Sequence, residues 1–453
     1  MDFTRRMFLG GASALAARPL LGAVADDAVA RAYETADGRA TDAVLARRIH
    51  LDLAGRIPTV REARDFVASA AEDKCARLVD RLLAADSFAD YWSLHLCDIL
   101  RVKSEFPINL WPNAVYVYHR RVRTFLRNDE PWDRFARALI TATGSDFRDA
   151  EANFFRATPE RTPEGFAAIV AQTFLGEDWA ERHPAEYKTF PAYFANVRIK
   201  GTREWKEELV LVDGQDRRGE FCKRLTQEWR RDLAAALVTR VDRWLFGDAA
   251  ARPEHVDAFL RHGLRLKPLL REIALSDAYA RGPVTGGYPC RRLDAEVLDD
   301  AIRDFTNEPR DYQSIAPEPF TFLPPRRRSV LIEDGSISSA FLTLFGRPAR
   351  DTGRLDERHN DITAKQRLYL FNSGRLYGSL ARLVNARKDF RRRPLRRQVD
   401  SLYWRILSRP PTAGETERLM QRFQSLPKGS ERGAFPVDLA WALVNTREFL
   451  YQH

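Results

Sequence analysis

Hydrophobic positions along this chain recur mainly at the spacing of amphipathic helices. Residues 74–84 show the pattern most clearly, because apolar side chains follow the i, i+3, i+4, i+7, i+8 series. The same spacing predicts further helices at about 41–54, 87–102, 112–127, 131–143, 163–175, 228–246, 253–262, 266–280, 340–345, 363–386, 395–408, 412–425 and 434–451. The pattern predicts a mainly α fold, built as two helical domains or as one extended helical body.

Local signals mark where some elements begin and end. Thr59 and Glu62 form a T-x-x-E capping box, which predicts the start of a helix. Gly176 is expected to end the helix before it. Residues 196–214 alternate apolar and polar positions and predict a small β-hairpin inserted among the helices. Residues 306–335 are rich in proline and predict a long irregular stretch, which is typical of functional or disordered loops.

The N-terminus has the form of a twin-arginine export signal. Arg5 and Arg6 follow a hydroxyl residue, and a Phe-Leu dipeptide comes after one spacer. The apolar run behind them is too short to span a bilayer, which needs about 20 apolar residues. Ala23 and Ala25 form an A-x-A cleavage site. We therefore expect a folded protein in the periplasm or secreted from the cell. A retained amphipathic first helix is the alternative.

These signals divide the chain into three segments. We predict a signal peptide at 1–25, an N-terminal helical domain at 26–220 and a C-terminal helical domain at 221–453. No second apolar run of about 18 residues follows the signal, so we expect no transmembrane span in the mature chain.

The composition is that of a globular protein with a basic surface. Hydrophobic residues make up 44% and charged residues 30%, and the formal net charge is +10. Arginine far outnumbers lysine, which suits contacts with carboxylate, sulfate or phosphate. Export argues against nucleic acid, so we expect other envelope proteins, an anionic glycan or an anionic membrane surface as partners. A basic surface that is merely solvated is the plainer interpretation.

The four cysteines Cys75, Cys97, Cys222 and Cys290 lie far apart and form neither a CxxC nor a CxxCH motif. This spacing excludes a zinc ribbon, a thioredoxin motif and a c-type haem attachment site. We predict no metal site. One disulfide is possible after export, but the spacing selects no pairing.

Longer phrases of the chain carry a family resemblance. In the first half they are ARRIHLDLAGRIPTVREARDFV (46–67), RLVDRLLAADSFADYWSLHLCDILR (77–101), ANFFR (152–156) and FAAIVAQTFLG (166–176). In the second half they are LAAALVTRVDRWLFG (233–247), GLRLKPLLREIALSDAY (263–279), RRLDAEVLDDAI (291–302), SAFLTLFGRP (339–348), RLYLFNSG (367–374) and DLAWALVNTREFLYQH (438–453). The chain resembles two paired domains of unknown function from secreted planctomycete-type proteins, in which the first domain often follows a cytochrome c domain.

The chain departs from that family in one informative place. Many relatives carry a C-x-x-C-H-x-H-P segment after the FLG phrase, which resembles a haem attachment site. This chain reads GEDWAERHPAEYKTFPAYFANV (176–197) and keeps only His183 and Pro184 of that segment. The resemblance therefore implies a member without covalent haem, and we predict no cofactor. His183 is either the remnant of a lost ligand set or a surface loop residue.

His95 and Asp98 are candidate chemical residues, because they lie three positions apart on one predicted helix. The carboxylate could orient the imidazole as a general base. The alternative is a buried pair that fixes helix packing.

Two arginine runs are candidate binding residues. Arg326, Arg327 and Arg328 lie in the proline-rich stretch, and Arg391, Arg392 and Arg393 lie between two predicted helices. Either run could hold sulfate or carboxylate groups through paired contacts. Charge runs are more often solvated faces.

Three functions stay open. The chain has no G-x-S-x-G elbow, Walker loop, dinucleotide fingerprint or HExxH motif, which favours a non-catalytic binding or assembly module of the cell envelope. The alternatives are an enzyme that acts on extracellular polysaccharide and a redox protein with a non-covalent cofactor.

Overall fold

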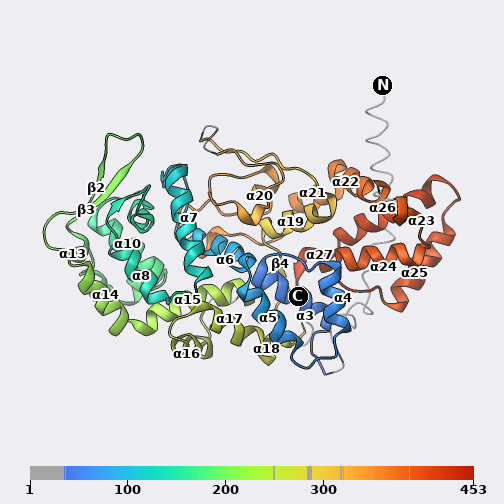
Figure 1. Cartoon of the computed structure of the whole chain (residues 1–453), viewed down its shortest axis with the longest axis horizontal. Helices are drawn as coiled ribbons and strands as arrows, with labels where there is room; N and C mark the ends of the chain where they lie inside the picture. Colours follow the sequence, from blue (N-terminus) through green and yellow to red (C-terminus); the bar gives the residue numbers. More distant parts are fainter. Residues whose placement is uncertain are drawn as a thin grey trace.

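The structure is a computed structural model that describes residues 35, 37–247, 250–282, 288–316, 319, 321–386 and 388–453. The predicted signal peptide lies outside these residues. Helices dominate the described chain and the sheets are small, which confirms the prediction of a mainly α fold (Figure 1). In the part of the chain that the structure describes, no helix is both long and apolar enough to cross a lipid bilayer.

The first half builds a helical bundle around α3 (Asp42–Ala54). This helix packs against α4 (Val60–Ala68), α5 (Lys74–Ala84) and α6 (Asp86–Ile99), and α6 also packs along α7 (Pro112–Arg127). The capping box predicted at Thr59 is confirmed at the start of α4. The remaining elements of this half are α8 (Trp132–Ile140), η1 (Ala150–Ala152), α9 (Asn153–Arg156), α10 (Pro163–Phe174), α11 (Trp179–Arg182), α12 (Pro184–Tyr187) and α13 (Pro191–Phe194).

The predicted hairpin is present as β2 (Val197–Gly201) and β3 (Glu208–Val212), which pair antiparallel with Val197 opposite Val212. A short strand that the sequence pattern did not predict, β1 (Gly144–Ser145), pairs with the other edge of β3. The sheet order is therefore β1-β3-β2. Val210 is buried on the central strand and anchors the sheet to the core.

The second half is a longer run of helices. Its elements are α14 (Arg218–Gln227), α15 (Arg230–Phe246), α16 (Pro253–Arg261), α17 (Leu266–Ala274), α18 (Asp277–Ala280), β4 (Arg291–Arg292), α19 (Ala295–Thr306), η2 (Ser329–Leu331), α20 (Ala340–Leu344), η3 (Leu355–Glu357), α21 (Ala364–Asn372), α22 (Gly374–Ala386), α23 (Lys388–Arg392), α24 (Leu395–Ile406), α25 (Ala413–Ser425), α26 (Ser430–Val444), α27 (Arg447–Leu450) and β5 (Tyr451–Gln452). Three predicted helices, 266–280, 363–386 and 434–451, are each divided by a short break.

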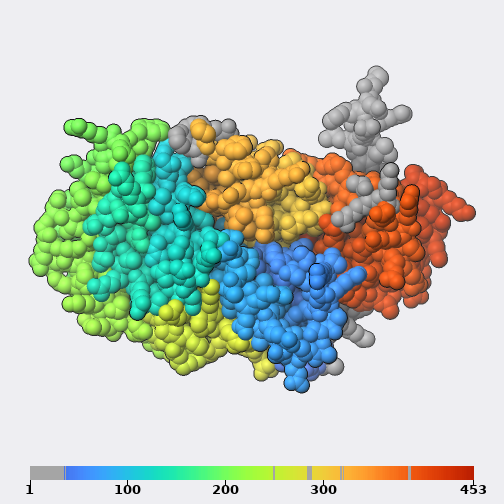
Figure 2. Space-filling model, viewed as in Figure 1, coloured from blue at the N-terminus to red at the C-terminus, as the bar shows by residue number. Residues whose placement is uncertain are grey.

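The two halves of the sequence share one hydrophobic core. α15 packs on α10, α17 packs on α5, and α24 touches α4. The blue N-terminal segment accordingly lies between yellow and red segments of the second half (Figure 2). The chain end returns to α3, where Arg48 Nε donates to the His453 carbonyl at 3.1 Å. The predicted division at 220/221 falls within α14 and stays a prediction.

Candidate functional site

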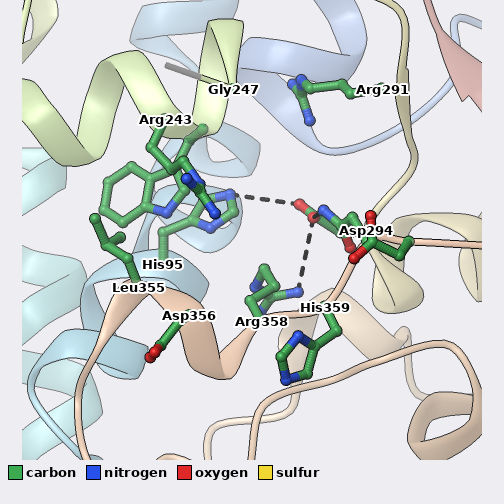
Figure 3. Close-up of a pocket in the computed structure, with 12 residues that line it drawn as sticks. His95, Arg243, Gly247, Arg291, Asp294, Leu355, Asp356, Arg358 and His359 are labelled. Atoms are coloured by element: carbon green, nitrogen blue, oxygen red, sulfur yellow. Dashed lines mark hydrogen bonds and ion pairs between the residues drawn. The ribbon is translucent and has the colours of Figure 1, made fainter. Parts of the chain in front are cut away.

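A pocket of about 330 Å³ opens where α6, α15, the start of α19 and the loop around η3 meet. Most of its lining residues have polar or charged side chains (Figure 3). The lining residues are His95, Arg243, Trp244, Gly247, Arg291, Asp294, Leu355, Asp356, Arg358, His359, Asn360 and Asp361. The pocket is therefore built from segments that lie far apart in the sequence.

His95 forms part of the inner wall and is only 2% exposed. Its ring stacks on the indole of Trp244 with centroids 4.7 Å apart. Its Nε2 lies 3.7 Å from Asp294 Oδ2, and its buried Nδ1 has no hydrogen-bond partner among the described residues. Burial lowers the pKa of His95 to about 4, against the opposing effect of Asp294. The imidazole is therefore neutral near pH 7.

Asp294 directly precedes α19 and is buried. It accepts hydrogen bonds from Asn360 Nδ2 at 2.7 Å and from the Tyr91 hydroxyl at 3.3 Å. Burial would raise the pKa of Asp294, but Arg358, His95 and Arg291 together hold it well below its usual range. Asp294 is therefore a fixed negative charge in the pocket wall.

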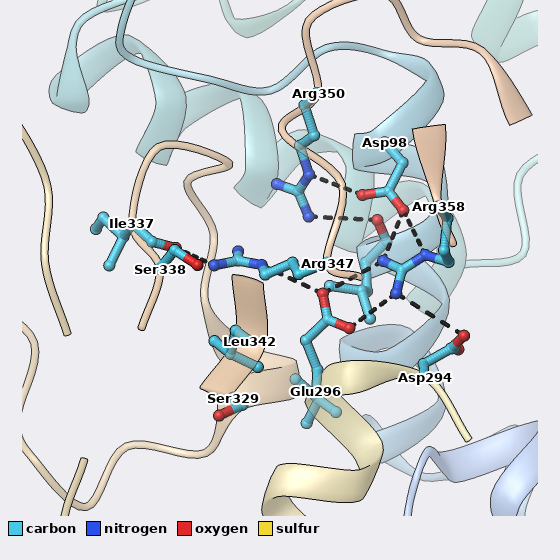
Figure 4. A network of polar contacts seen from close by, with 12 residues as sticks. Asp98, Asp294, Glu296, Ser329, Ile337, Ser338, Leu342, Arg347, Arg350 and Arg358 are labelled. Atoms are coloured by element: carbon cyan, nitrogen blue, oxygen red, sulfur yellow. Dashed lines mark hydrogen bonds and ion pairs between the residues drawn. The ribbon is translucent and has the colours of Figure 1, made fainter. Parts of the chain in front are cut away.

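Asp98 faces a network of arginines (Figure 4). Arg350 Nε donates to Asp98 Oδ1 at 2.8 Å, and Arg358 Nη2 donates to Asp98 Oδ2 at 2.8 Å. Burial would raise the pKa of Asp98, but Arg358 and Arg350 hold it below its usual range. The described contacts of Asp98 include no hydrogen bond to His95, so the carboxylate beside the imidazole is that of Asp294.

Glu296 completes this network from the first turn of α19. Arg358 Nη1 donates to Glu296 Oε2 at 2.8 Å, and Arg347 Nε lies 3.2 Å from Glu296 Oε1. Three buried carboxylates thus face three buried arginines, whose charges cancel. The full set is Asp98, Asp294, Glu296, Arg347, Arg350 and Arg358. Such a network costs little only while every member keeps its partner.

Two further arginines reach the pocket from other directions. Arg291 Nη2 donates to Asp52 Oδ1 at 2.6 Å, and Asp52 also accepts from the hydroxyls of Tyr279 and Tyr288. Arg243 on α15 is exposed, and its guanidinium has no ion-pair partner within the described ranges. The Arg243 guanidinium therefore offers hydrogen-bond donors at a pocket whose lining also includes the carboxylates of Asp356 and Asp361.

Two family models match the chain. The model PSCyt2, a protein of unknown function (DUF1549), matches residues 23–191, and the model PSD1, a protein of unknown function (DUF1553), matches residues 225–423. The chain belongs to the proteins that carry these two paired domains of unknown function. The two domains follow one another in the order that the sequence resemblance implies. No curated protein and no solved structure matches the chain.

The pocket lies at the junction of the two matched regions. His95 comes from the DUF1549 region, whereas Arg243, Asp294 and Arg358 come from the DUF1553 region. The sequence pattern singled out His95, but it gave no signal for its partners, because they are brought to α6 only by folding.

The other predicted residues lie elsewhere. Arg326 is exposed, Arg327 contacts Glu333, and Arg328 lies 3.3 Å from Asp300. Arg391 donates to the Gly433 carbonyl at 3.1 Å, and Arg391, Arg392 and Arg393 are all exposed. The two runs therefore form no part of the pocket at His95.

His183 lies in the DUF1549 region. Its ring stacks on the buried indole of Trp179 with centroids 4.7 Å apart. Across the described residues, no three His, Cys, Asp or Glu side chains are grouped so that they could hold a metal ion. All four cysteines are free thiols, and burial raises the pKa of Cys97 and of Cys222 to about 12.

Proposed function

We propose that this chain is a non-catalytic binding protein whose pocket takes the carboxylate or sulfate group of an acidic glycan. The exposed Arg243, which lacks an ion-pair partner among the described residues, carries the proposal. It lies beside a buried network whose charges already cancel. Because Asp356 and Asp361 also line the pocket, the proposal depends on the hydrogen-bond donors of the Arg243 guanidinium and not on a net positive charge. A guanidinium donates two parallel hydrogen bonds to such a group. The volume of about 330 Å³ suits a small ligand or one sugar unit of a chain.

The chemistry of the lining favours binding over catalysis. The described lining residues include no serine, threonine, cysteine, lysine or tyrosine that could serve as a nucleophile. A glycosidase needs one carboxyl group with a raised pKa as general acid. Asp294 has a lowered pKa instead, because Arg358 lies beside it.

The enzyme alternative rests on the pair of His95 and Asp294. A neutral imidazole beside a carboxylate can accept a proton, and His95 Nε2 lies 3.7 Å from Asp294 Oδ2. If the purified protein cleaved an acidic polysaccharide and the folded His95→Gln variant did not, the enzyme alternative would replace the binding proposal.

Calorimetric titration with acidic and neutral disaccharides tests the binding proposal. We expect a uronate or sulfated disaccharide to bind and the matched neutral disaccharide not to bind. Arg243→Gln should weaken binding by about tenfold, or about 1.4 kcal/mol, because one charged hydrogen-bond donor is lost.

The matched control is Arg120→Gln, which removes an exposed arginine of α7 that does not line the pocket. This variant should bind as the unchanged chain does. Equal losses in both variants would mean that overall charge, and not the pocket, determines binding, and the proposal would then be wrong.

We also propose that the chain acts outside the cytoplasm. The paired Arg5 and Arg6, the short apolar run and the A-x-A motif at residues 23–25 support export by the twin-arginine route. Replacing both arginines by lysine should leave the precursor in the cytoplasm, whereas the unchanged chain should appear in the periplasm without its leader. Export of the double variant at the normal rate would contradict this route.

A further inference from the structure

A second pocket, of about 430 Å³, lies between the start of α4, the end of α19 and α24. Its lining residues are Arg56, Ile57, Pro58, Thr59, Val60, Asp304, Phe305, Arg328 and Arg405. None of these residues lines the pocket at His95. The second pocket also combines the two matched regions, because residues 56–60 belong to the first and the other lining residues to the second.

Arg328 is the member of the 326–328 run that reaches this pocket. Its side chain is 34% exposed, and its Nε lies 3.3 Å from Asp300 Oδ2. Its Nε and Nη2 are shielded from solvent and are nevertheless without a hydrogen-bond acceptor among the described residues. By contrast, Arg327 donates to the Leu331 carbonyl at 2.9 Å. The Arg328 guanidinium thus lacks the hydrogen bonds that a bound oxyanion would supply.

The rest of the lining adds positive charge. Arg56 donates to both carboxylate oxygens of Glu62, at 2.8 and 2.7 Å, so its orientation is fixed. Arg405 approaches from α24. Asp304 is the one carboxylate among the described lining residues, and burial raises its pKa. Three arginines and one carboxylate therefore line the pocket, while Glu62 and Asp300 pair with Arg56 and Arg328 from outside the lining.

We propose that this second pocket binds a tetrahedral oxyanion, a sulfate or phosphate group, through Arg328 with Arg56 and Arg405 beside it. The shared chemistry is that of a group with several acceptor oxygens, which matches the planar donors of guanidinium. The proposal does not depend on the function proposed for the pocket at His95. The proposal also distinguishes the three arginines of the 326–328 run, since Arg328 is the one of them that would contact the ligand.

Titration with inorganic sulfate and inorganic phosphate, at an ionic strength held constant with chloride, tests the proposal. The titrations use the Arg243→Gln background, so that binding at the first pocket is weakened and contributes less to the signal. We expect binding of at least one oxyanion, weakened about tenfold or more by Arg328→Gln. Arg328→Lys should restore only part of it, because lysine keeps the charge and loses the planar donors. Preference for one ion separates a sulfate source from a phosphate source.

Two further variants serve as a matched control and as an independent test. Arg326→Gln removes a neighbouring exposed arginine that does not line the pocket and should bind normally. Asp304→Asn removes the opposing carboxylate and should tighten binding by about threefold or more. If Arg328→Gln fails to fold, Asp304→Asn alone tests whether the second pocket binds an oxyanion. No tightening in Asp304→Asn, or equal binding by Arg328→Gln and the unchanged chain, would overturn the proposal.

Discussion

The buried carboxylates of α6 and α19 each have an arginine within ion-pair distance. Asp98 has Arg350, Glu296 has Arg347, and Asp300 has Arg328. A buried charge without a partner costs several kcal/mol, so these pairs are conditions for folding as much as gains from it. His95 differs from these carboxylates, because burial keeps its ring uncharged beside Asp294.

This burial predicts a pH dependence for His95. The unfolded imidazole titrates near its ordinary pKa of 6.5 and the folded one near 4. Between these values the unfolded state binds more protons, so the free energy of unfolding falls as the pH falls. We expect His95 to contribute about 2 kcal/mol of this loss between pH 7 and pH 5. Urea unfolding at both pH values measures it.

The comparison with His95→Gln isolates that contribution. Asp300 and Asp438, whose pKa values burial raises to about 7 and about 6, act in the opposite direction and are unchanged in the variant. His453, whose pKa burial lowers to about 3, is unchanged as well. The variant should therefore lose less stability on acidification than the unchanged chain. The same loss in both proteins would show that His95 does not titrate as proposed.

Among the elements, the segment from α20 to residue 361 lines one side of the pocket and is held by hydrogen bonds to its backbone carbonyls. Arg292 Nη2 donates to the carbonyls of Phe345 at 2.6 Å and His359 at 2.9 Å. Gly346 lies between them with φ at +84°, and a Cβ on it would lie 1.9 Å from the His359 carbonyl oxygen. The turn therefore requires glycine for both its conformation and its space.

Gly346→Ala should destabilise the protein by about 1 to 3 kcal/mol, because it combines strain at positive φ with a clash. It should also weaken disaccharide binding, since His359 lines the pocket. Thermal unfolding and the titration described above measure the two effects. Gly374→Ala is the matched control, because a Cβ there meets nothing within 4 Å at the start of α22. If Gly346→Ala left both stability and disaccharide binding unchanged, the segment would accommodate the added methyl group without strain, and this prediction would be wrong.

The sequence pattern predicted most helices with a clear apolar stripe, but not α19. Its Val297, Leu298 and Ile302 have helical spacing, which is the signal that could have revealed it. The intervening Glu296, Asp299 and Asp300 are buried, although such residues normally indicate a solvated face. The helix that follows the pocket residue Asp294 was therefore hidden in the sequence pattern by the charged residues that it buries. The partners of His95 stayed unpredictable because no local pattern specifies which distant segments meet.

At the scale of the whole molecule, the two domains of unknown function are joined by one core and share both pockets. The helices of the first region contact α17 and α24 of the second, and α3 also contacts the chain end beyond the second matched region. A ligand in the pocket at His95 would touch both regions at once. The presence of both regions then has a physical meaning in this chain, because neither region alone supplies the complete lining.

The most direct test is a crystal structure of the chain soaked with a uronate disaccharide at saturating concentration. The account predicts that the ligand carboxylate lies in the pocket at His95, with an oxygen within about 3.2 Å of the Arg243 guanidinium. A disaccharide that occupies another surface, or a pocket that stays empty while calorimetry reports saturation, would contradict it.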